Sequence, residues 1–235
     1  MSVLTWGEIG SHTYETGVSK GVLYVTNDTG EYDAGVAWDG LINVTDKPEG
    51  AEAKKIYADN SVYATFRSAE EFKFSIEAYA YPTEFGVCDG TKSPVDGVYF
   101  GQQDRRSFGF CYRTEKGSDS AADDGYVLHL IYNATASPTE KSNDSINDSP
   151  DAKTFTWECD TTPVKVNQAG YKPTSEITFD STVLGKEKMA KIEEKLYGSA
   201  TDGTPTLPSP DEIIALLKAA LLHIEKIQNG GLNYV

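Results

Sequence analysis

The stretch EFKFSIEAY, Glu71–Tyr79, alternates between apolar and polar side chains over its whole length. Side chains of a β-strand point in turn to the two faces of a sheet, so this pattern predicts a strand with one buried and one wet face. The buried face holds Phe72, Phe74, Ile76 and Ala78, and the wet face holds Glu71, Lys73, Ser75, Glu77 and Tyr79. A strand covered on both faces would be apolar throughout, and the alternation therefore predicts an antiparallel sheet.

Eight further short runs are rich in β-branched and aromatic residues and are bounded by turn residues. This spacing predicts a mainly β fold, built as a β-sandwich or a barrel. The runs are Gly21–Thr26, Gly35–Trp38, Leu41–Val44, Val62–Phe66, Ser107–Arg113, Tyr126–Asn133, Thr154–Asp160 and Glu176–Phe179. Tyr126–Asn133 is largely apolar on both faces, which predicts a central strand. Asp39-Gly40 separates the second and third runs and predicts the two-residue turn of a tight hairpin.

Two helices are predicted late in the chain. Lys186–Tyr197 places apolar residues at helical spacing and ends at Gly198. The run Ser209-Pro210-Asp211-Glu212 combines an N-cap, a proline in the first turn and a capping-box glutamate, so a second helix is expected over Pro210–Gln228. Its broad apolar stripe must pack either on the chain's own sheet or on a partner. We therefore expect a β domain over residues 1–198, a linker over 199–209 and a C-terminal helical segment over 210–235.

The chain has a formal net charge of −15 over 235 residues, and its basic residues form no patch in the sequence. Such an acidic surface repels polyanions, which argues against tight nucleic-acid binding. Three widely spaced cysteines without a C-x-x-C pair indicate structural thiols in a reducing compartment. We also expect no secretion signal and no membrane span, because MSVLTWGEIG lacks the required regions and no apolar run approaches about 18 residues.

The sequence contains no motif typical of catalysis, cofactor binding or metal binding. His12, His129 and His223 are isolated from one another, and His129 falls in a buried-strand pattern that indicates a core histidine rather than a base. The acidic run after residue 142 lacks the glycine and the glutamate of a calcium-binding EF-hand. We therefore expect no enzyme activity, no cofactor and no metal site.

Residues 81–106 form a long segment that contains none of the predicted strands. A compact domain seldom contains a loop of this length without a purpose. Two interpretations are open from the residues: an arm that reaches a neighbouring subunit, or a mobile surface loop.

Several segments that together span nearly the whole chain, up to about Leu217, carry a family resemblance. In order they are TWGEIGSHTYETGVSKGVLYV from Thr5, GVAWDGLINVTDKPEGAEAKKIYADN from Gly35, IEAYAYPTEF from Ile76, FGQQDRRSFGFCYRT from Phe100, GYKPTSEITFDST from Gly170 and LPSPDEIIALL from Leu207. This series resembles the major tail tube protein of long-tailed, siphovirus-type bacteriophages, within the superfamily of phage tail tubes and type VI secretion tubes.

The resemblance implies a β-sandwich with a flanking helix, assembled as hexameric rings that stack into a tube, and it implies no reaction. Such a tube encloses a tape-measure protein until infection and then conducts duplex DNA into the host without binding it tightly. The tail terminator and the distal tail proteins are further implied partners. The implied location is the tail of a virion that is made in the cytoplasm of a host bacterium.

The resemblance also suggests roles for two sets of residues. A negatively charged tube wall would let DNA pass, because a basic wall would bind its phosphates at many points. The expected lumen-facing set is Glu71, Lys73, Ser75 and Glu77. The expected inter-subunit or inter-ring arm lies within residues 81–106 and includes Glu84, Phe85, Asp89, Lys92, Asp96, Tyr99, Arg105 and Arg106.

Two other classes of function are open from the sequence. Glu70, Glu71, Glu77 and Glu84, together with an aromatic content of 11%, are compatible with a carbohydrate-binding or glycan-processing β-sandwich. A tube component of a secretion or contractile injection apparatus would share the fold but belong to a different particle.

Overall fold

The computed structural model describes residues 4–8, 12–50, 52–119, 125–143, 145, 152–200 and 203–219. These residues form a mainly β structure, as predicted, with a main sheet of eight antiparallel strands. The strands are β1 (Thr13–Val25), β2 (Val36–Trp38), β3 (Leu41–Asp46), β8 (Lys73–Ala78), β11 (Phe108–Ser118), β12 (Gly125–Ala136), β13 (Phe155–Thr161) and β14 (Glu176–Asp180). Their order is β2-β1-β11-β12-β13-β8-β3, with β14 added beside β12.

Strand β12 is the point at which the sheet divides into two layers. One of its edges pairs with β11, whereas the other edge pairs with β14 over residues 127–131 and with β13 over residues 134–136. Asn133 lies between these two sections with a φ of +47°, and the register with β11 shifts by one residue at the same place. An extra residue of this kind bends a strand and increases its twist. The prediction that Tyr126–Asn133 is a central strand is confirmed.

The Asp39-Gly40 turn connects the two layers, and the prediction of a tight hairpin there is wrong. β2 pairs with β1, whereas β3 pairs with β8 at the opposite end of the sheet. Gly40 has a φ of +83°, which favours glycine, and a Cβ at this position would lie 3.2 Å from the backbone nitrogen of Ala80. The corner is held by Trp38, whose indole Nε1 donates to the carbonyl oxygen of Ala80 at 2.9 Å. A positive φ suits a corner as well as a hairpin, so the dipeptide alone does not decide which strands pair.

Aromatic side chains fill the space between the two layers. β2, β1, β11, β14 and the first part of β12 form one layer, and β13, β8 and β3 form the other. Trp38 meets Trp157 across this space with ring centroids 5.6 Å apart, and Phe74 stacks on Phe110 at 6.4 Å. The predicted alternation of β8 is confirmed, because every second residue from Phe74 to Ala78 is fully buried.

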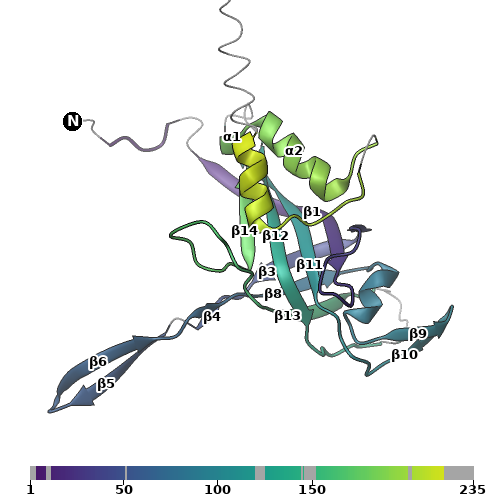
Figure 1. Ribbon diagram of the computed structural model, residues 1–235, viewed down its shortest axis with the longest axis horizontal. Coiled ribbons are helices and arrows are strands. Elements are labelled where there is room, and N and C mark those ends of the chain that lie inside the picture. The colour runs from purple at the N-terminus through teal and green to yellow at the C-terminus, as the bar shows by residue number, and fades with distance from the viewer. Residues whose placement is uncertain are drawn as a thin grey trace, which may run out of the picture.

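Helices cover the opposite face of β1, β11, β12 and β14 (Figure 1). The short α1 (Ser181–Leu184) follows β14 directly, and α2 (Lys186–Tyr197) then buries Met189, Ile192 and Leu196 against the sheet. Residues 210–219 are also helical and place Ile213 in the same apolar cluster. The first predicted helix is confirmed over its full length. The second begins where predicted and packs on the chain's own sheet, whereas its expected continuation over residues 220–228 lies outside the described residues.

The capping box at the start of the last helix is confirmed. The backbone N–H of Glu212 donates to Ser209 Oγ at 3.3 Å, and the N–H of Ser209 donates to Glu212 Oε2 at 2.7 Å. Residues 203–209, the described end of the expected linker, lie against the sheet. The N–H of Gly35 donates to Pro205 O at 2.9 Å, and Tyr132 Oη donates to Pro208 O at 3.0 Å. These bonds attach the helix to the body of the protein.

A long two-stranded extension projects from the β3–β8 hairpin away from the body (Figure 1). Its base is formed by β4 (Glu49–Gly50) and β7 (Glu70–Glu71), and its outer part by β5 (Ala53–Ala58) and β6 (Ser61–Arg67). Asp59 and Asn60 form the turn, both with φ values between +50° and +59°, a backbone that asparagine and aspartate tolerate better than most residues. β6 contains the predicted strand Val62–Phe66. We call residues 53–67 the arm.

Candidate functional site

The wet face of β8 is the outer surface of the β13-β8-β3 layer. Lys73, Ser75 and Glu77 point to this surface, because the residues between them are buried in the core. The strand register extends the same polar surface on both sides of β8. Its neighbours are Thr156, Glu158 and Asp160 on β13 and Asn43 and Thr45 on β3. Glu71 is not part of this ladder, since it lies in β7 opposite Glu49 at the base of the arm.

Acidic side chains outnumber basic ones on this outer surface. Lys73 Nζ lies 2.9 Å from Glu49 Oε2 and 3.2 Å from Asp160 Oδ1, and Lys47 Nζ lies 2.6 Å from Glu158 Oε1. Hydrogen bonds to Glu49 and Asp160 raise the pKa of Lys73 above its usual range, so this lysine is charged at neutral pH. Glu77 adds a further carboxylate to the surface. Two lysines therefore face four carboxylates, and the surface has a net negative charge.

The arm exposes apolar side chains that the rest of the described chain mostly buries. Tyr57, Tyr63 and Phe66 are 66%, 77% and 58% exposed, and Ile56 and Val62 are exposed beside them. β5 and β6 form a separate two-stranded sheet, so each has one edge with no strand partner in the described structure. Exposed apolar side chains and open strand edges both favour association with another protein surface.

The arm also has the opposite charge to the rest of the chain. It contains three basic side chains, Lys54, Lys55 and Arg67, and one carboxylate, Asp59. Its formal net charge is therefore +2, whereas the whole chain has −15. The pairing register places Lys54 opposite Phe66, Lys55 opposite Thr65 and Arg67 opposite Ala53, so the three basic side chains lie together at the end of the arm nearest its base.

The structure divides residues 81–106 into a buried part and an exposed part. The 3₁₀ helix η1 (Thr83–Val87) places Phe85 in the aromatic core, with Trp38 at 4.7 Å and Trp157 at 5.0 Å between ring centroids. Asp89 is also buried, and Arg105 and Arg106 are half-buried. β9 (Lys92–Val95) and β10 (Val98–Phe100) then form a small exposed hairpin (Figure 1). The exposed members of the expected set are Glu84, Lys92, Asp96 and Tyr99. Their contact with a neighbouring subunit stays a prediction.

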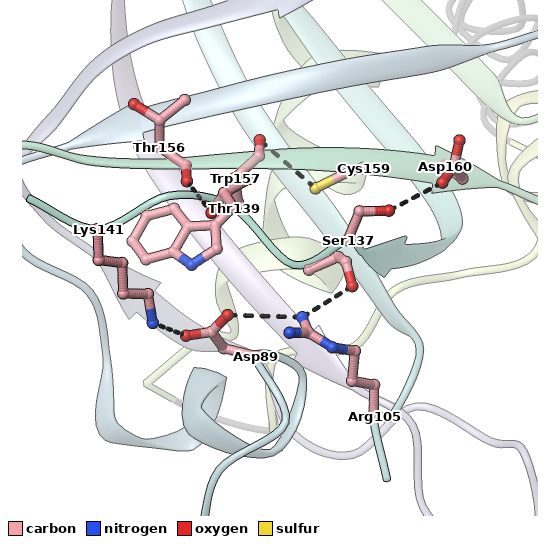
Figure 2. A network of polar contacts seen from close by, with 10 residues as sticks. Asp89, Arg105, Ser137, Thr139, Lys141, Thr156, Trp157, Cys159 and Asp160 are labelled. Atoms are coloured by element: carbon pink, nitrogen blue, oxygen red, sulfur yellow. Dashed lines mark hydrogen bonds and ion pairs between the residues drawn. The ribbon is translucent and has the colours of Figure 1, made fainter. Parts of the chain in front are cut away.

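A buried carboxylate holds the inner part of this segment to the body (Figure 2). Only 5% of the Asp89 side chain is exposed, and its two oxygens face Arg105 and Lys141 from different sides. Arg105 Nη1 lies 3.5 Å from Asp89 Oδ1 and donates to the carbonyl oxygen of Ala136 at 2.9 Å. Arg106 forms a separate ion pair with Asp28. The two arginines therefore bind to this chain's own body.

The segment after β12 is attached to β13 in the same region. Ser137 Oγ donates to Asp160 Oδ2 at 3.1 Å, and Thr139 Oγ1 donates to the carbonyl oxygen of Thr156 at 2.6 Å (Figure 2). Lys141 follows two residues later and donates to Asp89. Asp89 therefore joins the turn after η1, the segment before β11 and the segment after β12 in one network.

The chain matches no known family model and no curated protein sequence.

The three cysteines are free and buried in this structure. Burial raises the pKa of Cys88 and of Cys111 to about 12, and it raises that of Cys159 as well. A thiol is a nucleophile and a metal ligand chiefly as the thiolate, so these side chains act as core residues at neutral pH. In the described ranges, no three His, Cys, Asp or Glu side chains are grouped to hold a metal ion. None of the helices described is both long enough and apolar enough to cross a membrane.

Replacing Asp89 with alanine is expected to destabilise the fold by about 1–3 kcal/mol, because Arg105 and Lys141 lose charged hydrogen bonds. Urea denaturation of the monomer measures the loss. Hydrogen exchange should also accelerate at the N–H of Arg106, which donates to Val87 O at 3.1 Å. Asp96→Ala, in the exposed hairpin, is the matched control and should change stability by less than about 0.5 kcal/mol. Equal stability of the two variants would show that the buried network does not hold this segment.

Sequence reasoning missed the arm as a surface and Asp89 as a buried group. One clue to the arm was present: Asp59-Asn60 separates two runs of alternating character, which is typical of a hairpin. Lys54 and Lys55 obscured the first of these runs. No local pattern marks Asp89, because its partners Arg105 and Lys141 are 16 and 52 positions away in the chain.

Proposed function

We propose that this chain is a structural protein that self-assembles into stacked hexameric rings and forms the tail tube of a siphovirus-type phage. In this role the tube encloses a tape-measure protein and conducts DNA during ejection. The ring and its partners are proposed from the sequence resemblance. The arm is the structural observation that supports it most: an apolar, basic hairpin projects from an acidic body and has no other described element to bind.

The charge distribution supports association between copies of the chain. An arm with a charge of +2 is attracted to a body whose remaining residues have a net charge of −17. Association between different patches of identical subunits produces rings when the rotation closes and filaments when it does not. An arm that binds the body of the next copy is a contact of this kind.

The outer surface of the β13-β8-β3 layer supports the second part of the proposal. In a ring it supplies the wall of the channel, with Lys73, Ser75 and Glu77 facing the lumen and Glu158 and Asp160 beside them. Both of its lysines, Lys47 and Lys73, are already paired with carboxylates of the same surface. DNA phosphates bind strongly to surfaces with free basic side chains, and this wall offers few.

Assembly of the purified chain tests the proposal. Light scattering coupled to size-exclusion chromatography should show a mass that rises with concentration, and negative-stain electron microscopy should show rings or tubes with a central channel. A chain that stays monomeric at all concentrations would overturn the proposal. If such a monomer also bound oligosaccharides on a glycan array, the carbohydrate-binding class would take its place.

A further inference from the structure

A groove lies between the last helix and β14. One wall is the helix over residues 210–219, and the other wall is β14 together with the segment 164–174 that precedes it. The groove has a volume of about 490 Å³, which is within the usual range of binding pockets. Its apolar lining includes Tyr171, Ile177, Phe179, Ile213, Ile214 and Leu217. We call this feature the β14 groove.

Hydrogen bonds attach the two walls of the β14 groove to each other. The backbone N–H of Asn167 donates to Asp211 Oδ1 at 3.0 Å, and Asn167 Nδ2 donates to Asp211 Oδ2 at 2.6 Å. Further along the helix, Lys218 Nζ donates to Gln168 Oε1 at 3.3 Å. The groove is therefore formed before any partner binds, and a preformed site avoids the cost of ordering its walls on binding.

The arm presents an apolar face that suits such a groove. Val62, Ala64 and Phe66 are two residues apart along β6, so their side chains share one face. Residues paired across two antiparallel strands also point to the same face, and the register adds Tyr57 and Ile56 of β5 to it. Tyr57, Val62 and Phe66 are largely exposed in this structure. The outer part of the arm therefore has a continuous apolar face that nothing in the described structure covers.

The charges of the arm tip and of the β14 groove are opposite in sign. Asp59 is the only carboxylate of the arm, and it lies in the turn at the tip. Lys172 and Lys218 line the groove, and neither forms an ion pair within the described ranges. Glu176 also lines the groove, but its Oε1 is directed to His129 Nδ1 at 3.3 Å. A tip that enters the groove meets two lysines, while the basic end of the arm stays outside.

The arm does not fill the groove of its own chain. It leaves the body at the β3–β8 hairpin and extends away from it (Figure 1), and its two strands pair only with each other. The arm of a second copy can bring the same apolar face to the groove. Because the two surfaces are different, such a contact joins copies head to tail, and it closes into a ring or continues as a filament.

We propose that the β14 groove is the binding site for the arm of a neighbouring copy. The apolar face around Tyr57 and Val62 lies in the groove, and Asp59 lies beside Lys172 and Lys218. This contact removes apolar surface of both copies from water, which drives the association. The inference rests on the proposed self-assembly, and it names the surface of the body that receives the arm.

Two copies with complementary defects test the contact. The armless copy has Asn-Gly in place of residues 53–67 and keeps the groove. The second copy, Ile214→Glu, keeps the arm but places a carboxylate in the groove. Ile214 lines the groove without belonging to the buried cluster that contains Ile213, so the fold should survive, and thermal unfolding checks this. Ala215→Glu makes the same change of charge at the next, exposed residue and is the matched control.

Ile214→Glu alone should form neither rings nor tubes, whereas Ala215→Glu should assemble like the natural chain. Calorimetric titration of the Ile214→Glu copy into the armless copy should show binding of one copy to one. Adding Ile214→Glu to the armless copy should weaken this binding by at least about tenfold, because an unpaired carboxylate is buried against the arm. Adding Ala215→Glu instead should leave the affinity nearly unchanged.

Equal affinity of the armless copy with and without Ile214→Glu would overturn the β14 groove as the binding site. If the natural chain still formed rings or tubes in that case, the proposed function would stand and the arm would bind elsewhere. A natural chain that stays monomeric would instead overturn the proposed function. The titration between the two copies still decides the groove in that case, so the two failures can be told apart.

Discussion

Replacing the arm, residues 53–67, with the dipeptide Asn-Gly is expected to abolish rings and tubes and to leave a folded monomer. β5 and β6 pair with each other, and their aromatic side chains are exposed, so the body loses no core residue. Asn-Gly forms the tight turn that a two-residue hairpin requires, and β4 and β7 supply the strands on either side. Size-exclusion chromatography and electron microscopy measure assembly, and thermal unfolding confirms the integrity of the body.

A charge-reversal variant separates the two contributions of the arm. Lys54→Glu, Lys55→Glu and Arg67→Glu together keep the apolar residues and turn the attraction to the acidic body into repulsion, so assembly should weaken, and added salt should strengthen the assembly of this variant while weakening that of the natural chain. Lys186→Glu, Lys188→Glu and Lys191→Glu make the same change in net charge on α2 and should assemble more nearly like the natural chain. Tubes of normal appearance from the chain without its arm would contradict the proposed contact.

Phe85→Ala is expected to destabilise the monomer by about 3–5 kcal/mol, the cost typical of removing a buried phenylalanine. The ring is fully buried and lies 4.7 Å from Trp38, 5.0 Å from Trp157 and 5.4 Å from Phe108 between ring centroids. These three aromatic residues come from β2, β13 and β11, so the cavity affects both layers. Urea denaturation at a concentration where the chain is monomeric measures the loss.

Tyr99→Ala is the matched control for Phe85→Ala. Tyr99 belongs to the same segment, residues 81–106, but it lies in the exposed β9–β10 hairpin. Its removal should change monomer stability by less than about 0.5 kcal/mol. If the two variants were equally stable, η1 would not be part of the core, and the segment would act as a free loop along its whole length.

Features that depend on neighbouring residues in the sequence were predictable. The alternation of β8 and the apolar spacing of α2 reflect geometry within one element, and the capping box needs only Ser209 and Glu212. Pairing between strands that are distant in the chain was harder to predict from the sequence. Asp39-Gly40 indicates a positive φ, yet the burial of Trp38 among residues from both layers determines that the chain turns a corner there.

The wet face of the proposed channel was predictable only along one strand. The alternation identifies Lys73, Ser75 and Glu77, but Glu158 and Asp160 join them through a register that the sequence does not state. Glu71 follows the same alternation and still lies elsewhere, because residue 72 ends the short β7 pairing before β8 begins. The hydrogen bond between His129 on β12 and Glu176 on β14 likewise joins residues 47 positions apart in the chain.

The pairing of β1 with β11 has a consequence for the synthesis of the chain. Thr13 lies opposite Ser118, and Val25 lies opposite Phe108. The first strand can therefore pair with β11 only after residues 108–118 have been synthesised. At a translation rate of about 5–20 residues per second, this wait lasts roughly 4–20 s. Leu23 and Tyr24, which end up fully buried, have no sheet to cover them in that interval. The nascent chain is therefore most vulnerable to misassociation before β11 emerges from the ribosome.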